Sequence, residues 1–412
     1  MPQDWDEVIE EFKDAVIKNP ERSSLSLNLG ILLKKLEMYN GAEKEFRKAI
    51  QINPKCLEAH LNLGQLLRGA RRFDEAEKEF REAVNIDTNY AEAHLALARI
   101  LRGTKMYEES EREYREVLRI EPENFNAHNE LGLMLQGGGR FEEAKRELEE
   151  AVKIKPDYAN AHVSLGNLLT LLEKYEEAAK EYTEAIRIYP LDAGLHRKLA
   201  ECLKFVGKYD EAEQELRESI QIRPEFVEAR VGLAELLRHL DRLGEAENEL
   251  KEAIRIDPEN AGTHYVLGLV LSGQSKKNDA EKEYREAIRI YPTYKSAHYK
   301  IAHLLANTKR YDEAEREFKE LIALDPDDLK AHFELGNLYE NMERYEAAER
   351  ELRTAINIDP KDAGAHHHLA KLLEKMGRLE EADKEFKESK RIRHICNAAQ
   401  EAHAYDKIAR EL

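Results

Sequence analysis

A proline that recurs every 34 residues constrains this chain more than any other feature. Proline stands at every position of a 34-residue series from Pro20 to Pro360 except one, which Thr88 fills. A fixed period between about 20 and 50 residues is typical of solenoids, and about 34 is typical of a helix–turn–helix unit. With this proline as position 32, the chain divides into residues 1–22, eleven units of 34 over residues 23–396, and residues 397–412.

Each unit also carries two helical stripes. Position 7 is leucine or isoleucine, position 8 is glycine or alanine, position 20 is alanine except at Ser110, and position 24 is phenylalanine, tyrosine or leucine. Small residues at positions 8 and 20 let two helices cross closely, and we expect large residues at positions 17 and 24 to fill the space between units. Acidic residues open the second helix and the proline ends it. The sequence predicts an all-α chain with two helices per unit.

Composition excludes several classes of protein. A hydrophobic fraction of 42% is enough for a packed core, whereas a net charge of −18 argues against nucleic acid or anionic lipid as the main partner. No apolar run is long enough to span a membrane, and the first residues contain no apolar signal core. The three cysteines are too scattered to staple a fold. We expect a cytoplasmic protein without membrane insertion.

Position 4 forms a column of histidines. Neighbouring helix axes lie about 8–10 Å apart, but zinc–nitrogen bonds measure about 2.0–2.1 Å, so adjacent units cannot share a zinc ion. We interpret the column as rings that pack and bond locally, with mild acid sensitivity near pH 6 as a further hypothesis. The column comprises His60, His94, His128, His162, His196, His264, His298, His332 and His366, with Ser26 and Arg230 as exceptions.

No catalytic constellation is present in the sequence. The run Gly137–Gly139 looks like a phosphate-binding loop, but it follows no strand and falls in the predicted turn between two helices of a unit. No HExxH, CxxC or GxSxG motif occurs. We therefore expect a protein that is not an enzyme and that uses no cofactor or metal.

The set of a small residue at position 8, alanine at 20, an aromatic at 24 and proline at 32 resembles the tetratricopeptide repeat (TPR) family over essentially the whole chain. The resemblance implies a right-handed superhelical α-solenoid whose first helices line a concave groove that binds ligands. Residues 1–22 match only a second helix and form a partial repeat. Residues 397–412 form a capping or extension helix, and since no proline or glycine follows Gly377, the last second helix can continue to the end.

On this resemblance, positions 2, 5, 6, 9, 12 and 13 face the groove. They carry thirteen basic and nine acidic residues, so the groove is slightly basic within an acidic chain. Charges on the second helices, such as the Glu43–Arg47 pair, are interpreted as an ordinary solvated face. Lys34, Arg68 and Arg102 occupy position 12 of three successive units, with Arg99 beside them. This basic row predicts an acidic or carboxylate-bearing peptide ligand, and the alternative is that long side chains merely solvate helix ends.

Position 5 adds an apolar stripe that suits an extended or helical partner segment, and the middle units are rich in amides. A chaperone-tail carboxylate clamp is not matched, because the units with asparagine at position 9 carry Val163 and Phe333 at position 5. The sequence thus predicts a non-catalytic protein–protein interaction scaffold, or alternatively a structural protein that forms head-to-tail oligomers through its unequal ends. The candidate peptide-binding residues are Lys34, Arg68, Arg99, Arg102, Asn129, Asn167, Arg197, Lys204, Arg238, Tyr265, Tyr299, Phe333 and Asn337.

Overall fold

The computed structural model describes the backbone of residues 4–411 and the side chains of residue 5 and residues 7–395. Within this part of the chain there are 23 helices and no strand. Parts of the two expected end segments lie outside the described residues, namely residues 1–3 and the side chains of residues 397–412. Two compact units, residues 1–215 and 216–412, divide the chain.

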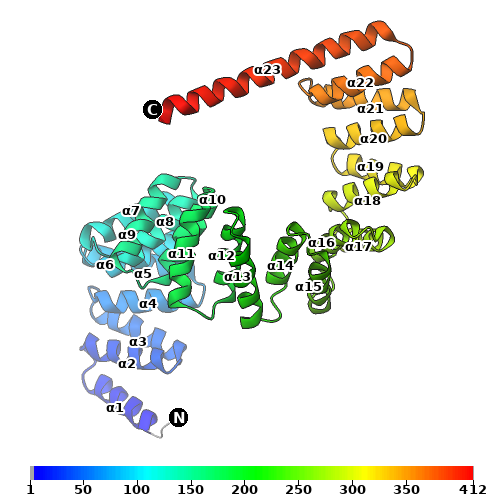
Figure 1. Cartoon of the computed structure of the whole chain (residues 1–412). Helices are drawn as coiled ribbons and strands as arrows, with labels where there is room; N and C mark the ends of the chain where they lie inside the picture. The colour runs from blue at the N-terminus through cyan, green and yellow to red at the C-terminus, as the bar shows by residue number, and fades with distance from the viewer. Residues whose placement is uncertain (1–3, 412) are drawn as a thin grey trace. The chain divides into compact units, whose positions relative to one another are not determined.

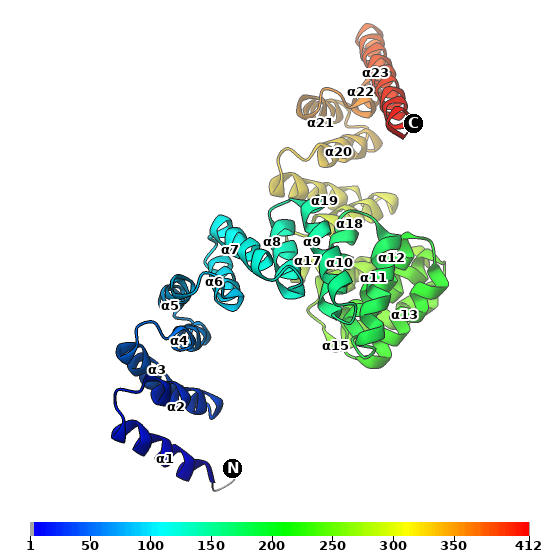
Figure 2. The ribbon, with the colours of Figure 1, turned by 90° about the vertical axis from the view of Figure 1, so that its left-hand side faces the viewer.

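After α1 (Asp4–Lys18), first and second helices alternate in eleven pairs (Figure 1). The first helices are α2 (Ser23–Lys35), α4 (Leu57–Gly69), α6 (Ala91–Gly103), α8 (Phe125–Gly137), α10 (Ala159–Leu171), α12 (Ala193–Phe205), α14 (Val227–His239), α16 (Ala261–Gly273), α18 (Lys295–Asn307), α20 (Leu329–Asn341) and α22 (Ala363–Lys375). The second helices are α3 (Tyr39–Ile52), α5 (Phe73–Ile86), α7 (Tyr107–Ile120), α9 (Phe141–Ile154), α11 (Tyr175–Ile188), α13 (Tyr209–Ile222), α15 (Leu243–Ile256), α17 (Lys277–Ile290), α19 (Tyr311–Leu324), α21 (Tyr345–Ile358) and α23 (Leu379–Glu411). Each of the helices α1 to α11 and α14 to α22 packs against the next helix along the chain, as α2–α7 do in Figure 2, which confirms the predicted α-solenoid.

The turn between the two helices of a pair has one conformation in all eleven pairs. The residue at position 15 has a positive φ throughout, as at Arg71 (60°) and Gly139 (77°), although only three of these residues are glycine. The next N–H, that of Arg72, donates to the carbonyl of Leu67 at 2.9 Å and closes the end of the first helix. The run Gly137–Gly139 is this turn, as its position in the repeat predicted.

The glycines at position 8 are required by close helix crossing. A Cβ added to Gly64 would lie 2.5 Å from the ring of Phe80, and one added to Gly268 would lie 2.5 Å from that of Tyr284. Both rings occupy position 24 of the same pair. The side chain at position 24 thus packs on the first helix of its own pair, and at Tyr114 it also reaches the next pair, where the hydroxyl donates to Glu130 at 2.8 Å.

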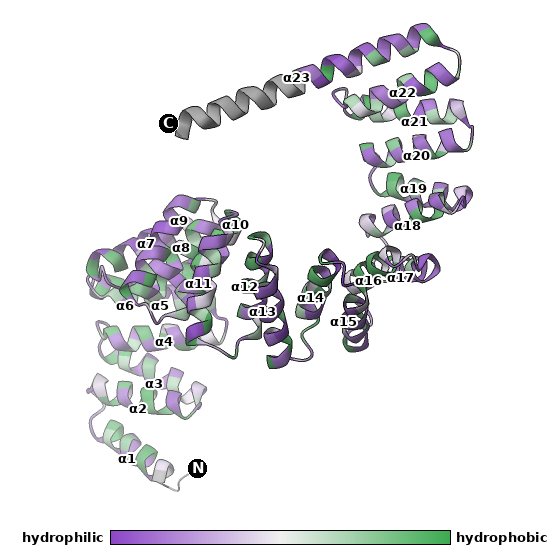
Figure 3. Ribbon diagram, in the orientation of Figure 1, coloured by the Kyte–Doolittle hydropathy of each residue, from purple (hydrophilic) through white to green (hydrophobic). Residues whose placement is uncertain are grey.

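The second helices form a charged outer face. The Arg47–Glu43, Arg81–Glu77 and Arg115–Glu111 pairs form as predicted, at 2.8, 2.9 and 2.7 Å. Arg72 also bridges to Glu43 of the preceding second helix at 2.9 Å. Figure 3, which is coloured by hydropathy, shows hydrophilic residues among hydrophobic ones along second helices such as α15.

The two ends differ. Helix α1 packs against α2 through the buried side chains of Ile9 and Val16, while Ile17 is exposed. Helix α23 runs without a break to Glu411, well beyond its contacts with α22 (Figure 1). No helix in the described part of the chain is both long enough and apolar enough to cross a membrane.

Candidate interaction surface

First helices of successive pairs approach one another along one side of each unit. Helix α2 contacts α4, α4 contacts α6 and α8 contacts α10 in residues 1–215, and α14 contacts α16 in residues 216–412. Successive second helices are instead bridged by long charged side chains such as Arg72 and Glu43. The first-helix face is therefore the more closely packed side of the stack, and it carries the candidate binding residues.

Lys34 and Arg68 form a cationic pair at the start of this face. The Nζ of Lys34 donates to Asn62 Oδ1 at 3.1 Å and to Gln65 Oε1 at 2.8 Å, so α2 is tied to α4 by neutral acceptors. Burial and then the charge of Arg68 lower the pKa of Lys34, while Glu92 acts in the opposite direction. No carboxylate among the described side chains forms an ion pair with Lys34 or Arg68.

The next two cations of the predicted row are neutralised within the protein. Arg99 makes a bidentate contact with Glu130, at 2.8 Å from Nε and 2.5 Å from Nη2, and Arg102 lies 3.7 Å from the same carboxylate. Tyr114 donates its hydroxyl to Glu130 at 2.8 Å, and burial together with that charge raises the pKa of Tyr114. Arg99 and Arg102 thus bridge two pairs through Glu130, whereas Lys34 and Arg68 have no such carboxylate partner among the described side chains.

Further along the first unit, the candidate residues Asn167, Arg197 and Lys204 each contact a neighbouring side chain. Asn167 accepts from the hydroxyl of Tyr182 at 2.9 Å and also from Lys198. Arg197 lies 3.4 Å from Glu201. Lys204 lies over the ring of Phe205, 5.8 Å from its centroid.

Asn129 differs from these residues, because its side chain is buried and its Oδ1 has no hydrogen-bond partner among the described residues. Gln136, two turns further along α8, also has an unpartnered buried oxygen. Both groups are acceptors on the first-helix face that an N–H donor could satisfy.

The aromatic candidates of the second unit lie in successive pairs and are half-buried. Tyr265 packs against Tyr294, with ring centroids 5.1 Å apart. Tyr299 donates its hydroxyl to Asp328 at 2.7 Å, and Phe333 meets His368 edge-on at 4.7 Å.

Two polar candidates accompany these rings. Asn337 has a buried Oδ1 without a partner among the described residues. Arg238 lies close enough to Tyr265 for its charge to act on the pKa of that phenol, which burial raises.

The histidine column is a set of three-way clamps. In His162, Nδ1 lies 2.7 Å from Glu181 Oε2 of the second helix of its pair, and Nε2 lies 2.9 Å from the carbonyl of Pro156 in the preceding pair. The same two contacts occur at all nine histidines of the column, with Thr88 replacing proline for His94. Both ring nitrogens face oxygen acceptors, and only the imidazolium has two N–H donors. The clamp is complete when the ring is protonated, and no ring nitrogen remains for a metal.

The charge of the glutamate acts on the histidines in the expected direction. For His162 and His264, the hydrogen bond to Glu181 or Glu283 raises the pKa more than burial lowers it. For His60, His128 and His298, burial lowers the pKa, but the glutamate and the backbone carbonyl together raise it further, so the net shift is upward.

These shifts give the pH response its sign. A group whose folded-state pKa is raised contributes stability that is complete below its unfolded value and is lost as the pH rises through the folded value. For these five histidines the raised pKa predicts a pH response opposite in sign to the hypothesised acid sensitivity, because their clamps are intact on the acid side and weaken on the alkaline side.

The two exceptions in the column support a cationic clamp. Arg230 makes the same contacts with a permanent charge, from Nε to the carbonyl of Pro224 at 3.1 Å and from Nη1 to Glu249 at 2.6 Å. Ser26 cannot reach so far, and both its hydroxyl and Oε2 of Glu45, which lies 19 residues later, are buried without partners in the described structure.

Sequence reasoning missed the glutamate of the clamp, although its signal was present. Glutamate occupies position 23 of all eleven units, 19 residues after the histidine, as in His60 and Glu79. A glutamate in every unit, always 19 residues after the histidine position, could have indicated from the sequence that the two side chains pair.

Comparison with known proteins agrees with these repeating features. Models of the tetratricopeptide repeat match residues 34–100, 67–131, 130–193, 206–267, 273–332, 310–367 and 342–404. No curated protein matches the chain. Stacked helix pairs with a common turn define a helical-repeat protein.

Three solved structures to which the chain is similar are those of YrrB, PilF and Tom70. YrrB, described as a TPR protein with an unusual peptide-binding site, is 25% identical over 46% of this chain and 98% of its own, with a TM-score of 0.39. PilF of Pseudomonas aeruginosa is 22% identical over 50% of this chain and 94% of its own (TM-score 0.44), and yeast Tom70 is 14% identical over 95% and 93% (TM-score 0.47). With the repeat models matching most of its length, the chain belongs to the tetratricopeptide repeat family.

Proposed function

We propose that this protein is a non-catalytic scaffold that binds segments of partner proteins along its first-helix face. TPR proteins form a fold that generally serves protein–protein interaction. The partner segments we propose are acidic for the first-helix face of residues 1–215 and carry apolar side chains for that of residues 216–412.

The observation that carries the proposal is the pair Lys34 and Arg68. Lys34 is partly desolvated, lies close to a second cation, and is held by two amide oxygens rather than by a carboxylate. A partner carboxylate here relieves the repulsion between the two cations and gains charge-assisted hydrogen bonds. The neighbouring Arg99 is excluded from this role by its contact with Glu130.

Two further features suit a polypeptide ligand. The unpartnered oxygens of Asn129, Gln136 and Asn337 accept hydrogen bonds, and every non-proline residue of a peptide has a backbone N–H to donate. Tyr265, Tyr299 and Phe333 are half-buried, so each leaves part of an aromatic surface for apolar side chains.

The test uses a fluorescently labelled peptide of alternating glutamate and leucine, followed by fluorescence anisotropy. We expect Lys34→Glu/Arg68→Glu to weaken binding by about tenfold or more, since each charge-assisted contact contributes about 1.5–3 kcal/mol. The matched control is Lys153→Glu, which reverses an exposed lysine on the second helix α9. Equal binding by the wild type and the double variant refutes the proposed site.

The alternative of head-to-tail self-assembly is favoured by the unequal ends. Helix α1 is a second-helix-like element with exposed Trp5 and Ile17, and α23 continues past α22. Multi-angle light scattering over a range of concentrations decides between the two functions. A mass that stays at that of the monomer supports the scaffold, and a mass that grows with concentration supports assembly.

A further inference from the structure

A repeated pair of bridges links successive second helices on the outer face. The preceding helix supplies a glutamate and, four residues later, an arginine, and the following helix supplies the partner charges. Between α3 and α5, Glu43 meets Arg72 at 2.9 Å and Arg47 meets Glu75 at 3.0 Å. The same bridges join α7 to α9, α17 to α19 and α21 to α23.

Helix α11 lacks both residues of this bridge. Ala179 stands where α3, α7, α17 and α21 have the glutamate, and Thr183 stands where they have the arginine, whereas every other second helix has a charged residue at both positions. The Thr183 hydroxyl instead donates to the carbonyl of Ala179 at 2.8 Å, within its own helix.

The α13 side of this junction has the charged residues of the complete bridges, here Lys208 and Glu211. In the complete bridges, the cation meets two carboxylates, as Arg72 meets Glu43 and Glu75. Among the ion pairs of the described residues, Lys208, directly before α13, meets one carboxylate, that of Glu211, at 3.1 Å. Thr183 offers Glu211 no cation in the place where the complete bridges have an arginine.

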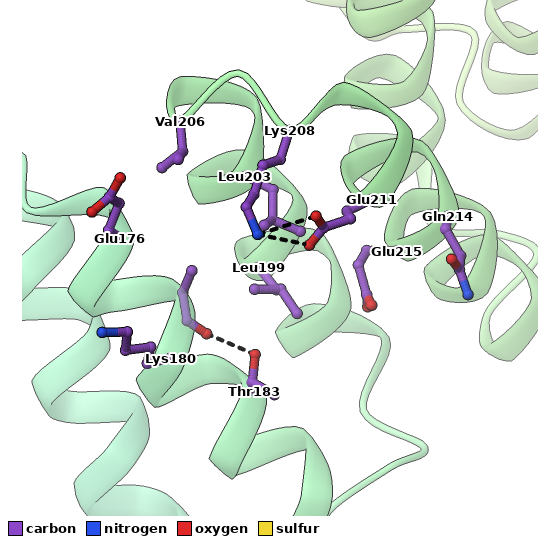
Figure 4. Close-up of a pocket in the computed structure, with 11 residues that line it drawn as sticks. Glu176, Lys180, Thr183, Leu199, Leu203, Val206, Lys208, Glu211, Gln214 and Glu215 are labelled. Carbon is purple, nitrogen blue, oxygen red and sulfur yellow. Dashed lines mark hydrogen bonds and ion pairs between the residues drawn. The ribbon is translucent and has the colours of Figure 1, made fainter.

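A cavity of about 510 Å³ opens where these side chains are missing (Figure 4). Its volume falls in the range of about 300–1,000 Å³ typical of ligand pockets. Leu199, Leu203 and Val206 of the α12 segment supply apolar walls, and Ala179 adds to them from α11. Lys180 also lines the cavity, and it forms no ion pair among the described residues.

We propose that this α11–α13 pocket is a second docking site, distinct from the first-helix face, for a helix of a partner protein. The partner helix places an apolar side chain between Leu199 and Leu203. A glutamate and an arginine one turn apart on the same helix pair with Lys208 and Glu211, in place of the charges that Ala179 and Thr183 do not supply. The proposal follows from the charge pattern of the complete junctions and does not depend on ligand binding at Lys34 and Arg68.

The test is a selection from a library of helix-forming peptides. In each peptide glutamate and arginine stand four residues apart, and the three residues between them vary. The matched control is the variant Ala179→Glu/Thr183→Arg, which rebuilds the bridge found at other junctions and fills the cavity. We expect the wild type to enrich peptides with large apolar residues, and the filled variant to bind them about tenfold more weakly or worse. A thermal unfolding scan checks that the filled variant is folded.

The selected peptides must also bind the Lys34→Glu/Arg68→Glu variant with unchanged affinity. The proposal is overturned if the filled variant binds equally well, if no apolar residue is enriched, or if binding is lost on reversal of Lys34 and Arg68. Self-association of the wild type that disappears in the filled variant also overturns it, since the occupant is then a second copy of this chain.

Discussion

The histidine clamp makes the most specific prediction about this molecule, and His162 is the best place to test it. Its ring is buried, and it joins three elements through Glu181 and Pro156. Glu184 also faces the ring and raises its pKa. His162→Ala removes both bonds, whereas His162→Arg keeps them if arginine adopts the geometry of Arg230.

The expected magnitude follows from the two bonds. A hydrogen bond to a charged group contributes about 1.5–3 kcal/mol, and one to a neutral carbonyl contributes about 1 kcal/mol. We therefore expect His162→Ala to cost about 2–4 kcal/mol at about pH 6, and His162→Arg to cost less than about 1 kcal/mol. When the pH rises above the ordinary histidine value of about 6.5 and through the raised pKa, the wild-type contribution is lost and the arginine contribution is kept.

The assay is urea unfolding at an acidic and an alkaline pH for the wild type and both variants, with hydrogen exchange of the α10 amides as a local measure. The local measure is needed because repeat arrays open in segments rather than all at once. Equal destabilisation by alanine and arginine, or a stability at this junction that rises with pH, contradicts a protonated clamp.

Four further substitutions test the repeat itself by the same unfolding assay. Ser26→His gives the buried Oε2 of Glu45 a donor, and we expect a gain of about 1 kcal/mol; a loss of stability contradicts the idea of an unfilled clamp. Gly64→Val forces a side chain into the ring of Phe80 and should cost about 1–3 kcal/mol, while Gly69→Ala, with nothing within 4 Å, should change stability by less than about 1 kcal/mol. Lys309→Gly relieves a positive φ of 60° and should raise stability by up to about 1 kcal/mol; no gain contradicts strain at this turn.

The fold could be predicted from the sequence because each repeat carries the same types of residue at the same positions. The proline period, the small residues at position 8 and the alanines at position 20 fix where helices begin, cross and end, and the structure places the turn at Gly137–Gly139 as predicted. The close contact of position 24 with position 8 was not predicted, because a stripe shows which face is buried but not which helices cover it. Phe80 covers Gly64 of its own pair.

The charged residues were harder to predict, for a physical reason. Column position identifies the cations on the first-helix face, but not which of them already have a partner. Arg102 and Arg68 both occupy position 12, yet Arg102 lies 3.7 Å from Glu130 and no carboxylate among the described side chains pairs with Arg68. The α11–α13 pocket likewise depends on two substitutions, Ala179 and Thr183, whose effect appears only when the facing helix is in place.

The central claim is that partner segments bind the first-helix face. Hydrogen exchange of the protein with and without the glutamate–leucine peptide tests it most directly. We predict that the peptide slows amide exchange in the first helices α2 and α4, around Lys34 and Arg68, and leaves amide exchange in the second helices α3 and α5 unchanged. Protection confined to the second helices, or absent throughout the chain at saturating peptide, contradicts it.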